Sequence, residues 1–403
     1  MNPLLNKLQP YPFEKLNALK AAVIADTSKA HIALSIGEPK HKPPKFVLDA
    51  WQNNLDKVSL YPKTAGRDDL KQSIIDWLTS RFNLQNESLS HKQVLPLNGT
   101  REGIFAFVQA IADNSKANAK VLMPNPFYQI YEGAAFLAGL APYFIPCLKE
   151  NNFLANIEAL VESDEQVLKD CQVLFICTPG NPTGAVIPQA QLVRLIELAD
   201  QYDFIIASDE CYSELYFDET KPPCGLLEAA SSMGRHSYER CVVFHSLSKR
   251  SNLPGLRSGF IAGDEDVVQA FLKYRTYHGC AMAEPTQLAS IAAWQDESHV
   301  VNNRVLYKQK FEQVLETLDG SLNVAMPDAS FYLWPELPTN DESFCQKLFA
   351  EQHITCLPGQ YLSRTVDGIN PGQGFARIAL VAEAAECIEA AKRIKQFIQR
   401  HFS

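Results

Sequence analysis

The chain of 403 residues is predicted to be an α/β protein, with a large domain built on a mostly parallel sheet flanked by helices and a smaller α+β domain. Three observations lead to this prediction. The length exceeds the size at which a single hydrophobic core stops growing. Helical and strand-like apolar patterns alternate between about residues 67 and 295, as expected when helices cover both faces of a parallel sheet. After residue 297, long helical stretches and a few short strands replace this alternation.

The alternating region begins with two amphipathic helices and continues with short strands. Residues 67–82 carry Leu70, Ile74 and Leu78 on one helical face, and residues 100–113 repeat that period. A further helix is expected at residues 189–202, between the second and third of the expected strands. The expected strands are residues 121–123, 173–177, 204–207, 241–244 and 258–262. Residues 46–295 are therefore predicted to form the large domain.

The smaller domain is expected to combine both ends of the chain. A long helix is predicted at residues 299–318, with short strands near residues 331–334 and 377–380 and a final helix from residue 382 to about residue 401. Together with an N-terminal arm, residues 1–45, the segment 296–403 is predicted to form this domain.

Composition and charge exclude several classes of function. Hydrophobic residues make up 46% of the chain and charged residues 21%, as in ordinary globular proteins. The net charge of −9 argues against nucleic acid and against an anionic membrane surface as partners. Because no apolar run is long enough for a spanning helix and no signal-peptide pattern is found, a cytoplasmic location is expected. The 10 cysteines include no Cys-x-x-Cys pair, and no metal site is expected.

The most informative stretch lies directly after the expected strand at residues 241–244. It contains Lys249 among serines, followed by Arg257. A lysine that is desolvated beside a second cation loses its proton more easily and can attack a carbonyl, while the cation and the hydroxyls can hold a phosphate. Enzymes that bind pyridoxal phosphate as a Schiff base need both properties. The plainer interpretation of a single lysine is a solvated surface amine.

Polar residues also follow other expected strands, where ligands bind in open parallel sheets. Asn181 lies in a segment rich in Pro and Gly after the second strand, and Asp209 and Tyr212 follow the third. Gly99 and Thr100 open the helix at residues 100–113, whose free N–H groups can hold a phosphate. Taken singly, each has a plainer interpretation, namely a turn around Asn181 and helix caps at Asp209 and Thr100.

Together these segments resemble the class I and II aminotransferases, which have the aspartate aminotransferase fold (fold type I of the pyridoxal-phosphate-dependent transferases). The resemblance covers nearly the whole chain. Besides the residues around Lys249, Asn181 and Asp209, it includes Ile36-Gly37-Glu38-Pro39 as a substrate loop and Phe375-Ala376-Arg377-Ile378 as a carboxylate-binding segment.

The resemblance implies a role for each matching residue. Lys249 forms the Schiff base with pyridoxal 5′-phosphate and then carries a proton, Asp209 keeps the pyridine nitrogen protonated, and Tyr212 adjusts the ring electronically. Gly37, Asn181 and Arg377 bind the substrate. The residues implied to bind the cofactor are Gly99, Thr100, Arg101, Tyr128, Asn181, Asp209, Tyr212, Ser246, Ser248, Lys249 and Arg257, together with Tyr61 from the neighbouring subunit of a homodimer with shared active sites.

Residues 248–255 and 100–107 are most similar to the N-succinyldiaminopimelate aminotransferases of bacterial lysine biosynthesis. The implied reaction moves an amino group between glutamate or 2-oxoglutarate and N-succinyl-2-amino-6-oxopimelate or N-succinyl-LL-diaminopimelate. The distal carboxylates of these substrates require positive charge at the mouth of the site. Candidates for that charge are Lys40, His41, Lys42, Lys63 and Arg101, although for any single one of them a solvated surface charge is the favoured interpretation.

Three alternatives stay open at this point. The first is another class I aminotransferase of the aspartate, aromatic or alanine type. The second is a pyridoxal-phosphate-dependent lyase, which would keep Lys249, Asp209 and Arg377. The third is a transcription regulator on the same fold. It is disfavoured because the resemblance begins by about residue 34, which leaves little room for a DNA-binding module.

Overall fold

The computed structural model describes residues 1–402, and its largest sheet has seven strands. These are β2 (Val94–Leu97), β3 (Lys120–Asn125), β4 (Ala141–Pro146), β5 (Cys171–Cys177), β6 (Ile205–Asp209), β7 (Cys241–Ser246) and β8 (Gly259–Gly263). They lie in the order β2-β8-β7-β6-β5-β3-β4. The strands from β7 to β4 are parallel, whereas β8 is antiparallel to both of its neighbours. The predicted fold class is therefore confirmed.

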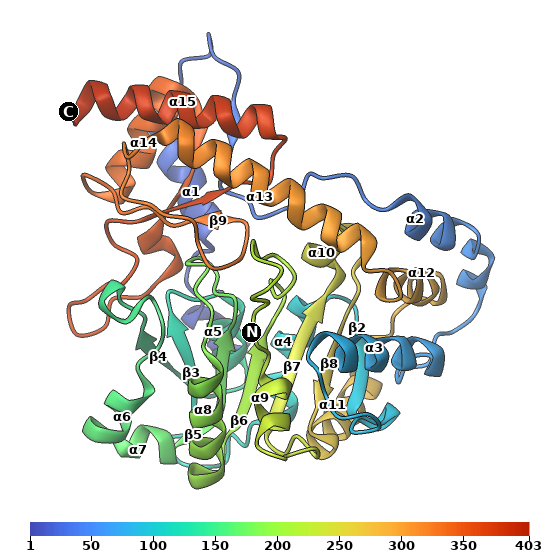
Figure 1. Ribbon diagram of the computed structural model, residues 1–403. Coiled ribbons are helices and arrows are strands. Elements are labelled where there is room, and N and C mark those ends of the chain that lie inside the picture. The colour runs from blue at the N-terminus through green and yellow to red at the C-terminus, as the bar shows by residue number, and fades with distance from the viewer. Residues whose placement is uncertain (403) are drawn as a thin grey trace.

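Helices cover both faces of this sheet (Figure 1). Alternate residues of each buried strand point to opposite faces, so both faces carry apolar side chains that the helices bury. Val242 and Phe244 of β7 join one hydrophobic cluster, while Cys241 and Val243 join another. The first cluster includes α4 (Thr100–Ile111), α5 (Ile130–Leu137) and α11 (Glu265–His278). The second includes α3 (Asp68–Arg81), α8 (Gln189–Tyr202), α9 (Leu226–Ser232) and α12 (Glu284–Trp294).

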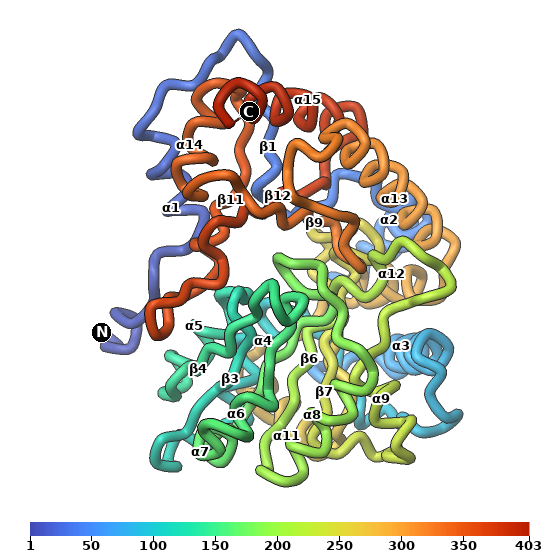
Figure 2. Tube along the Cα trace, turned by 60° about the vertical axis from the view of Figure 1, so that its left-hand side comes forward, coloured from blue at the N-terminus to red at the C-terminus, as the bar shows by residue number. Residues whose placement is uncertain are grey.

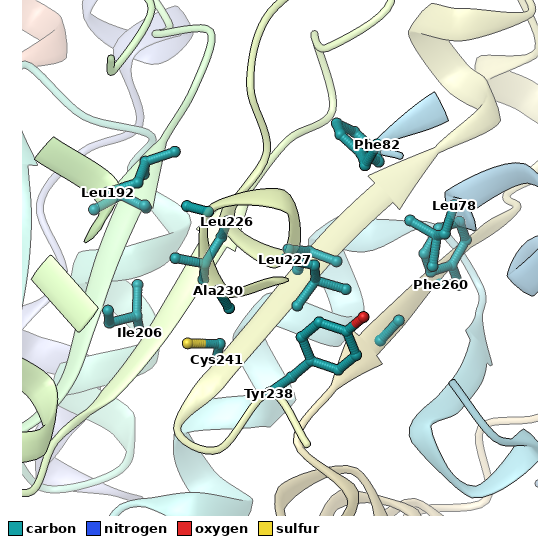
Figure 3. Close-up of a cluster of buried hydrophobic side chains, with 14 of the residues drawn as sticks. Leu78, Phe82, Leu192, Ile206, Leu226, Leu227, Ala230, Tyr238, Cys241 and Phe260 are labelled. Atoms are coloured by element: carbon teal, nitrogen blue, oxygen red, sulfur yellow. The ribbon is translucent and has the colours of Figure 1, made fainter. Parts of the chain in front are cut away.

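Figure 3 shows part of the second cluster, where Leu226 and Leu227 of α9 pack over Ile206 of β6 and Cys241 of β7. All four side chains are buried. Because full burial of one leucine is worth about 2 kcal/mol, this packing fixes α9 against the sheet. Ile206 belongs to β6, the strand that ends at Asp209.

Elements from both ends of the chain pack around a separate hydrophobic cluster. β1 (Ile32–Ala33) pairs in parallel with β10 (Ile354–Thr355), and a small antiparallel sheet has the order β11-β12-β9, from β11 (Leu357–Pro358), β12 (Ala376–Ala379) and β9 (Tyr332–Leu333). α13 (Ser298–Leu318) runs from beside α12 towards α14 (Asp341–Gln352) and α15 (Ala384–His401), as Figures 1 and 2 show. The domain limits at residues 45/46 and 295/296 stay a prediction.

The remaining helices are α1 (Pro12–Ala21), α2 (Lys45–Gln52), α6 (Ile157–Ser163), α7 (Glu165–Lys169) and α10 (Leu247–Arg250). No helix in the described part of the chain has the length and apolar character that crossing a membrane requires.

The helices predicted at residues 67–82, 100–113, 189–202 and 299–318 correspond to α3, α4, α8 and α13. The sequence analysis missed β2 and β4, which lie at the two edges of the sheet. Both contain proline, namely Pro96 in β2 and Pro142 in β4. Proline is tolerated in edge strands, since only one side of such a strand needs its backbone N–H groups. The same prolines hide these strands from a propensity-based prediction.

Candidate active site

A cavity of about 540 Å³ lies at the carboxyl ends of the parallel strands, where α/β sheets bind ligands. Residues of the N-terminal arm and of β12 complete its wall. All the predicted site residues except Gly99 and Tyr61 line it: Gly37, Thr100, Arg101, Tyr128, Asn181, Asp209, Tyr212, Ser246, Ser248, Lys249, Arg257 and Arg377. The fold therefore brings together residues that are far apart in the sequence.

Lys249 lies in α10, the short helix directly after β7. The hydroxyl of Ser246 caps this helix by accepting a hydrogen bond from the backbone N–H of Ser248 at 3.0 Å. The ammonium Nζ of Lys249 donates to the carbonyl of Gly37. Burial, with a contribution from Arg377, lowers the pKa of Lys249 from 10.5 to about 8. At pH 7 about one such amine in ten is then neutral, against about one in three thousand for an ordinary lysine.

Asp209 is the last residue of β6 and is buried. It continues the strand, so the helix cap considered from the sequence is wrong. Its Oδ2 accepts a hydrogen bond from the hydroxyl of Tyr131 at 2.8 Å, and its Oδ1 accepts one from the backbone N–H of Cys211 at 3.3 Å. Burial raises the pKa of Asp209, and these hydrogen bonds oppose that rise. A protonated ring nitrogen at this point would supply the opposite charge that the carboxylate needs.

The corner formed by Gly99, Thr100, Ser246 and Arg257 fits a phosphate. Gly99 is the N-cap of α4, a position that the sequence analysis considered for Thr100, and its φ of 81° lies in the region that favours glycine. A Cβ at Gly99 would collide with the guanidinium of Arg257. Helix N–H groups, hydroxyls and a guanidinium at such close range are the donors that phosphate groups prefer.

Arg377, on β12, fits a carboxylate. It is buried, and its Nη1 and Nη2 donate to Oδ1 of Asn181 at 3.0 Å and to the carbonyl of Ser35 at 2.8 Å. Its guanidinium lies 4.4 Å from the ring centre of Tyr332. Within residues 1–402 its Nε has no hydrogen-bond partner. A guanidinium held in this way is oriented in advance for a planar, bidentate anion.

Four cationic side chains, none with an ion-pair partner among the described residues, gather in this cavity, although the protein as a whole is acidic. Arg101, Lys249, Arg257 and Arg377 line it, and in the described part of the chain no carboxylate lies within ion-pair distance of any of them. The acidic residues of this wall are Asp209 and Glu38. Asp209 is buried and forms no ion pair with these four cations, and Glu38 lies 3.4 Å from the ammonium of Lys40. The cavity therefore suits a ligand set with one phosphate and several carboxylates.

Of the five candidates for binding distal carboxylates, one lies in the cavity wall and four do not. Only Arg101 lines the cavity, where its Nε donates to the hydroxyl of Tyr128 at 2.7 Å. The expectation for His41 is wrong, because its ring is turned away and bonded to Asn303 and Lys310. The cavity wall does not include Lys40, Lys42 or Lys63 either.

Tyr61 is also absent from the cavity wall, since its side chain is fully exposed. An exposed position within this chain is what a residue directed at a neighbouring subunit requires.

The sequence analysis did not identify Tyr131, Cys211 and Tyr332 as site residues. Tyr131 lies on α5 and is stacked on Phe175 at 4.5 Å, so in the sequence it resembles an ordinary core aromatic. The hydroxyl of Tyr332 lies 3.1 Å from that of Tyr212. Cys211 faces the cavity between Asp209 and Tyr212, and only its place between two predicted site residues could have indicated this.

Comparisons with known proteins agree with this geometry. Residues 29–394 match the family described as aminotransferase class I and II. The LL-diaminopimelate aminotransferase of Maridesulfovibrio salexigens is 31% identical over 398 residues, which covers 97% of both chains. A crystal structure of an aminotransferase from Neisseria meningitidis has a TM-score of 0.93 and 44% identity, and the match covers 98% of this chain and 100% of that one.

A probable N-succinyldiaminopimelate aminotransferase from Thermus thermophilus has a TM-score of 0.82 at 26% identity, over 96% of this chain and 99% of that one. The family match and the relatives extend over almost the entire sequence, and the cavity has the donors that a phosphate and a carboxylate need. The chain therefore belongs to the class I and II aminotransferases, enzymes that depend on pyridoxal phosphate.

Proposed function

We propose that this aminotransferase moves an amino group between glutamate or 2-oxoglutarate and N-succinyl-2-amino-6-oxopimelate or N-succinyl-LL-diaminopimelate. The observation that carries the proposal is the presence of two guanidinium groups, those of Arg101 and Arg377, in addition to Arg257 at the phosphate corner. Such a cavity can bind a carboxylate at each end of a long substrate. An overall charge of −9 makes this local positive charge all the more selective.

A second candidate substrate is unsuccinylated LL-diaminopimelate, which is favoured by the name of the relative from Maridesulfovibrio salexigens. This substrate carries a free ammonium at its distal end, where the succinylated one carries an amide and a further carboxylate. Glu38 lines the cavity and has the charge to pair with that ammonium. Both candidates carry a carboxylate that Arg101 could bind, so Glu38 is the residue that distinguishes them.

We assign the chemical roles in the same proposal. Pyridoxal phosphate, when bound, supplies the electron-accepting ring on which the amino group is exchanged. Lys249 takes a proton from the substrate Cα through Nζ, for which its lowered pKa suits it. Asp209 holds a proton on the ring nitrogen, Tyr128 covers the ring, and Arg377 fixes the α-carboxylate.

A panel of 2-oxo acids with glutamate as the donor tests the proposed function. The succinylated oxo acid is expected to give a kcat/KM at least about tenfold above those of oxaloacetate, phenylpyruvate and pyruvate, because only it has a distal carboxylate at the right distance for Arg101. Equal values for oxaloacetate would contradict this assignment and favour an aspartate-type enzyme. A lyase would release ammonia and leave no 2-oxoglutarate.

Replacing Arg101 with Gln is expected to lower kcat/KM for the succinylated substrate about 10- to 100-fold, since a charge-assisted hydrogen bond is lost. With alanine as the amino acid substrate, which has no distal carboxylate, the kcat/KM of this variant is expected to stay within about threefold of the wild-type value. The comparison variant is Glu38→Gln, assayed on both diaminopimelate substrates. A selective loss on the unsuccinylated substrate would identify Glu38 as its ammonium partner and would favour the second candidate.

We further propose a homodimer whose active sites are shared. Large apolar side chains are exposed along α2 and the segment that follows it: Phe46, Leu48, Trp51, Leu55, Val58, Leu60 and Tyr61. A patch of this kind marks an interface on a soluble protein. Its continuity with Tyr61 supports a second copy as the occupant, with Tyr61 reaching the phosphate corner of that copy.

Mixing two inactive variants tests the shared site. Lys249→Ala removes the amine, and Tyr61→Ala removes the group expected from the neighbour. A hybrid dimer would contain one site with both defects and one intact site, so refolding an equal mixture is expected to restore up to about a quarter of wild-type activity. No recovery, in a mixture that size-exclusion chromatography shows to be dimeric, would mean that each chain builds its site alone.

A further inference from the structure

A buried cluster of polar side chains lies beside the active site but outside its wall. His41, on the loop after Gly37, contacts three residues of α13. Its Nδ1 lies 2.7 Å from Oδ1 of Asn303, its Nε2 lies 2.8 Å from Nζ of Lys310, and its ring centre lies 4.5 Å from that of Tyr307. The ring is thus held on two edges and one face.

The partners determine the protonation state of this imidazole. The ammonium of Lys310 can only donate, so Nε2 of His41 must accept. Nδ1 then carries the proton and donates it to the carbonyl oxygen of Asn303. His41 is therefore neutral, in a single tautomer and a single orientation.

Lys310 connects this loop to the strand of Arg377. Its side chain is only 1% exposed, and its ammonium also donates to the carbonyl of Leu380 at 3.2 Å, just beyond the end of β12. No carboxylate in the described part of the chain forms an ion pair with it. A buried ammonium is costly, and apolar side chains usually fill such a volume more favourably. The ammonium of Lys310 instead donates hydrogen bonds to two separate segments, the loop of His41 and the end of β12.

Asn303 connects the cluster to the segment that carries Lys249. Its Oδ1 accepts a second hydrogen bond, from Nδ2 of Asn252 at 3.0 Å. Asn252 follows the helix α10, in which Lys249 lies. The loop of Gly37, the strand of Arg377 and the segment after Lys249 therefore all meet on the same helix.

We propose that His41 and Lys310 are positioning residues. They hold the substrate loop around Gly37 in a fixed position relative to Arg377 and Lys249. The start of this loop is fixed separately, because the backbone N–H of Ala379 donates to the carbonyl of Leu34 at 2.7 Å. Its other end is held by the backbone N–H of Lys40, which donates to the carbonyl of Val381 at 3.3 Å, and by the side chain of His41 on α13. Between these ends, the carbonyls of Ser35 and Gly37 accept hydrogen bonds from Arg377 and Lys249, so the position of the loop and that of the two site residues are linked. Misplacing a substrate-contacting group by about 1 Å can cost about 100-fold in kcat/KM, and here the loss is expected in KM because the loop binds the substrate rather than the reacting atoms. This role adds to the aminotransferase activity and does not depend on which substrate is used.

The test compares His41→Phe, which keeps the packing on Tyr307 but loses both hydrogen bonds, with His41→Gln, whose amide can accept from Lys310 and donate to Asn303. His41→Phe is expected to raise KM for the amino acid at least tenfold while kcat changes less than about threefold. The dissociation constant of a non-reacting dicarboxylate, measured by calorimetry on the cofactor-loaded enzyme, is expected to rise by a similar factor. His41→Gln is expected to restore both values to within about threefold.

Lys310→Met is expected to reproduce His41→Phe, and if this variant fails to fold, the two His41 variants carry the test alone. A purely structural role predicts a different result, namely a lower kcat in proportion to the fraction of folded enzyme, with KM unchanged. That result, or equal impairment of His41→Gln and His41→Phe, would overturn the proposal.

A pH profile gives a second readout. Burial lowers the pKa of His41, as does the charge of Lys310, while the hydrogen bond with Asn303 and the charge of Glu383 oppose this. Because its pKa is lowered, His41 takes up a proton only at a pH below the range of an ordinary histidine, where the imidazolium would face the ammonium of Lys310. KM of the wild type is therefore expected to rise on this acid side. The His41→Gln variant has no such group, and its KM is expected to lack this acid limb. An acid limb that persists unchanged in His41→Gln would contradict the assignment.

Discussion

Replacing Lys249 with alanine is expected to lower kcat for transamination by at least about 10⁴-fold. In the roles proposed for Lys249, the variant loses both the amine that would bind the cofactor covalently and the group that would take the proton from Cα. Proton transfer alone accounts for about 10² to 10⁴. Single-turnover mixing of the cofactor-loaded variant with glutamate, followed by absorbance, measures the effect.

Lys249→Arg is the matched control for this change. It keeps a cation at the end of β7, but a guanidinium does not release its proton at neutral pH. We expect it to be as inactive as the alanine variant, while circular dichroism and thermal unfolding show both proteins to be folded. More than about 1% of wild-type activity in either variant would contradict the role of Lys249.

Replacing Asp209 with asparagine is expected to lower kcat/KM by about 10² to 10⁴. The substitution keeps the shape of the side chain and removes the buried negative charge. In the proposed role, that charge holds a proton on the ring nitrogen, a form of preorganised electrostatic stabilisation. Steady-state kinetics at saturating cofactor measures this loss, and the cofactor content of the purified protein shows that the effect is not one of occupancy alone.

Tyr131→Phe separates the charge of Asp209 from its orientation. It removes the hydrogen bond from the hydroxyl to Oδ2, found at 2.8 Å, and leaves the carboxylate charged. We expect a loss of about 10- to 100-fold, because a hydrogen bond to a charged group is worth about 1.5–3 kcal/mol. If Asp209→Asn lost no more than Tyr131→Phe, the charge of Asp209 would not be the important property.

The parts of the fold that the sequence predicts are those with strong local patterns. α8 was expected at residues 189–202 and is found there, because its apolar residues repeat with helical spacing between a proline and the αL residue Asp203. The edge strands β2 and β4 could not be predicted, since their prolines disfavour strands except at an edge. Whether a strand lies at an edge is set by tertiary structure.

In the candidate site, too, local sequence patterns predict some residues, whereas contacts between distant segments could not be predicted. Asp209 and Lys249 lie at or just after strands, so the general rule for ligand binding in parallel sheets is enough to group them. The bonds from Arg377 to Ser35 and from Lys310 to His41 join segments at opposite ends of the chain. No local pattern indicates such contacts. For this reason His41 was expected from the sequence to be a charge at the mouth of the site or on the surface, whereas its half-buried ring is bonded to Asn303 and Lys310 of α13.

Reduction of the cofactor-loaded enzyme with borohydride, followed by digestion and mass spectrometry, shows which residue holds the cofactor. We expect one phosphopyridoxyl group, attached to Nζ of Lys249 in the peptide that follows β7. Attachment to any other lysine, or retention of the cofactor without a reducible bond to the protein, would contradict it.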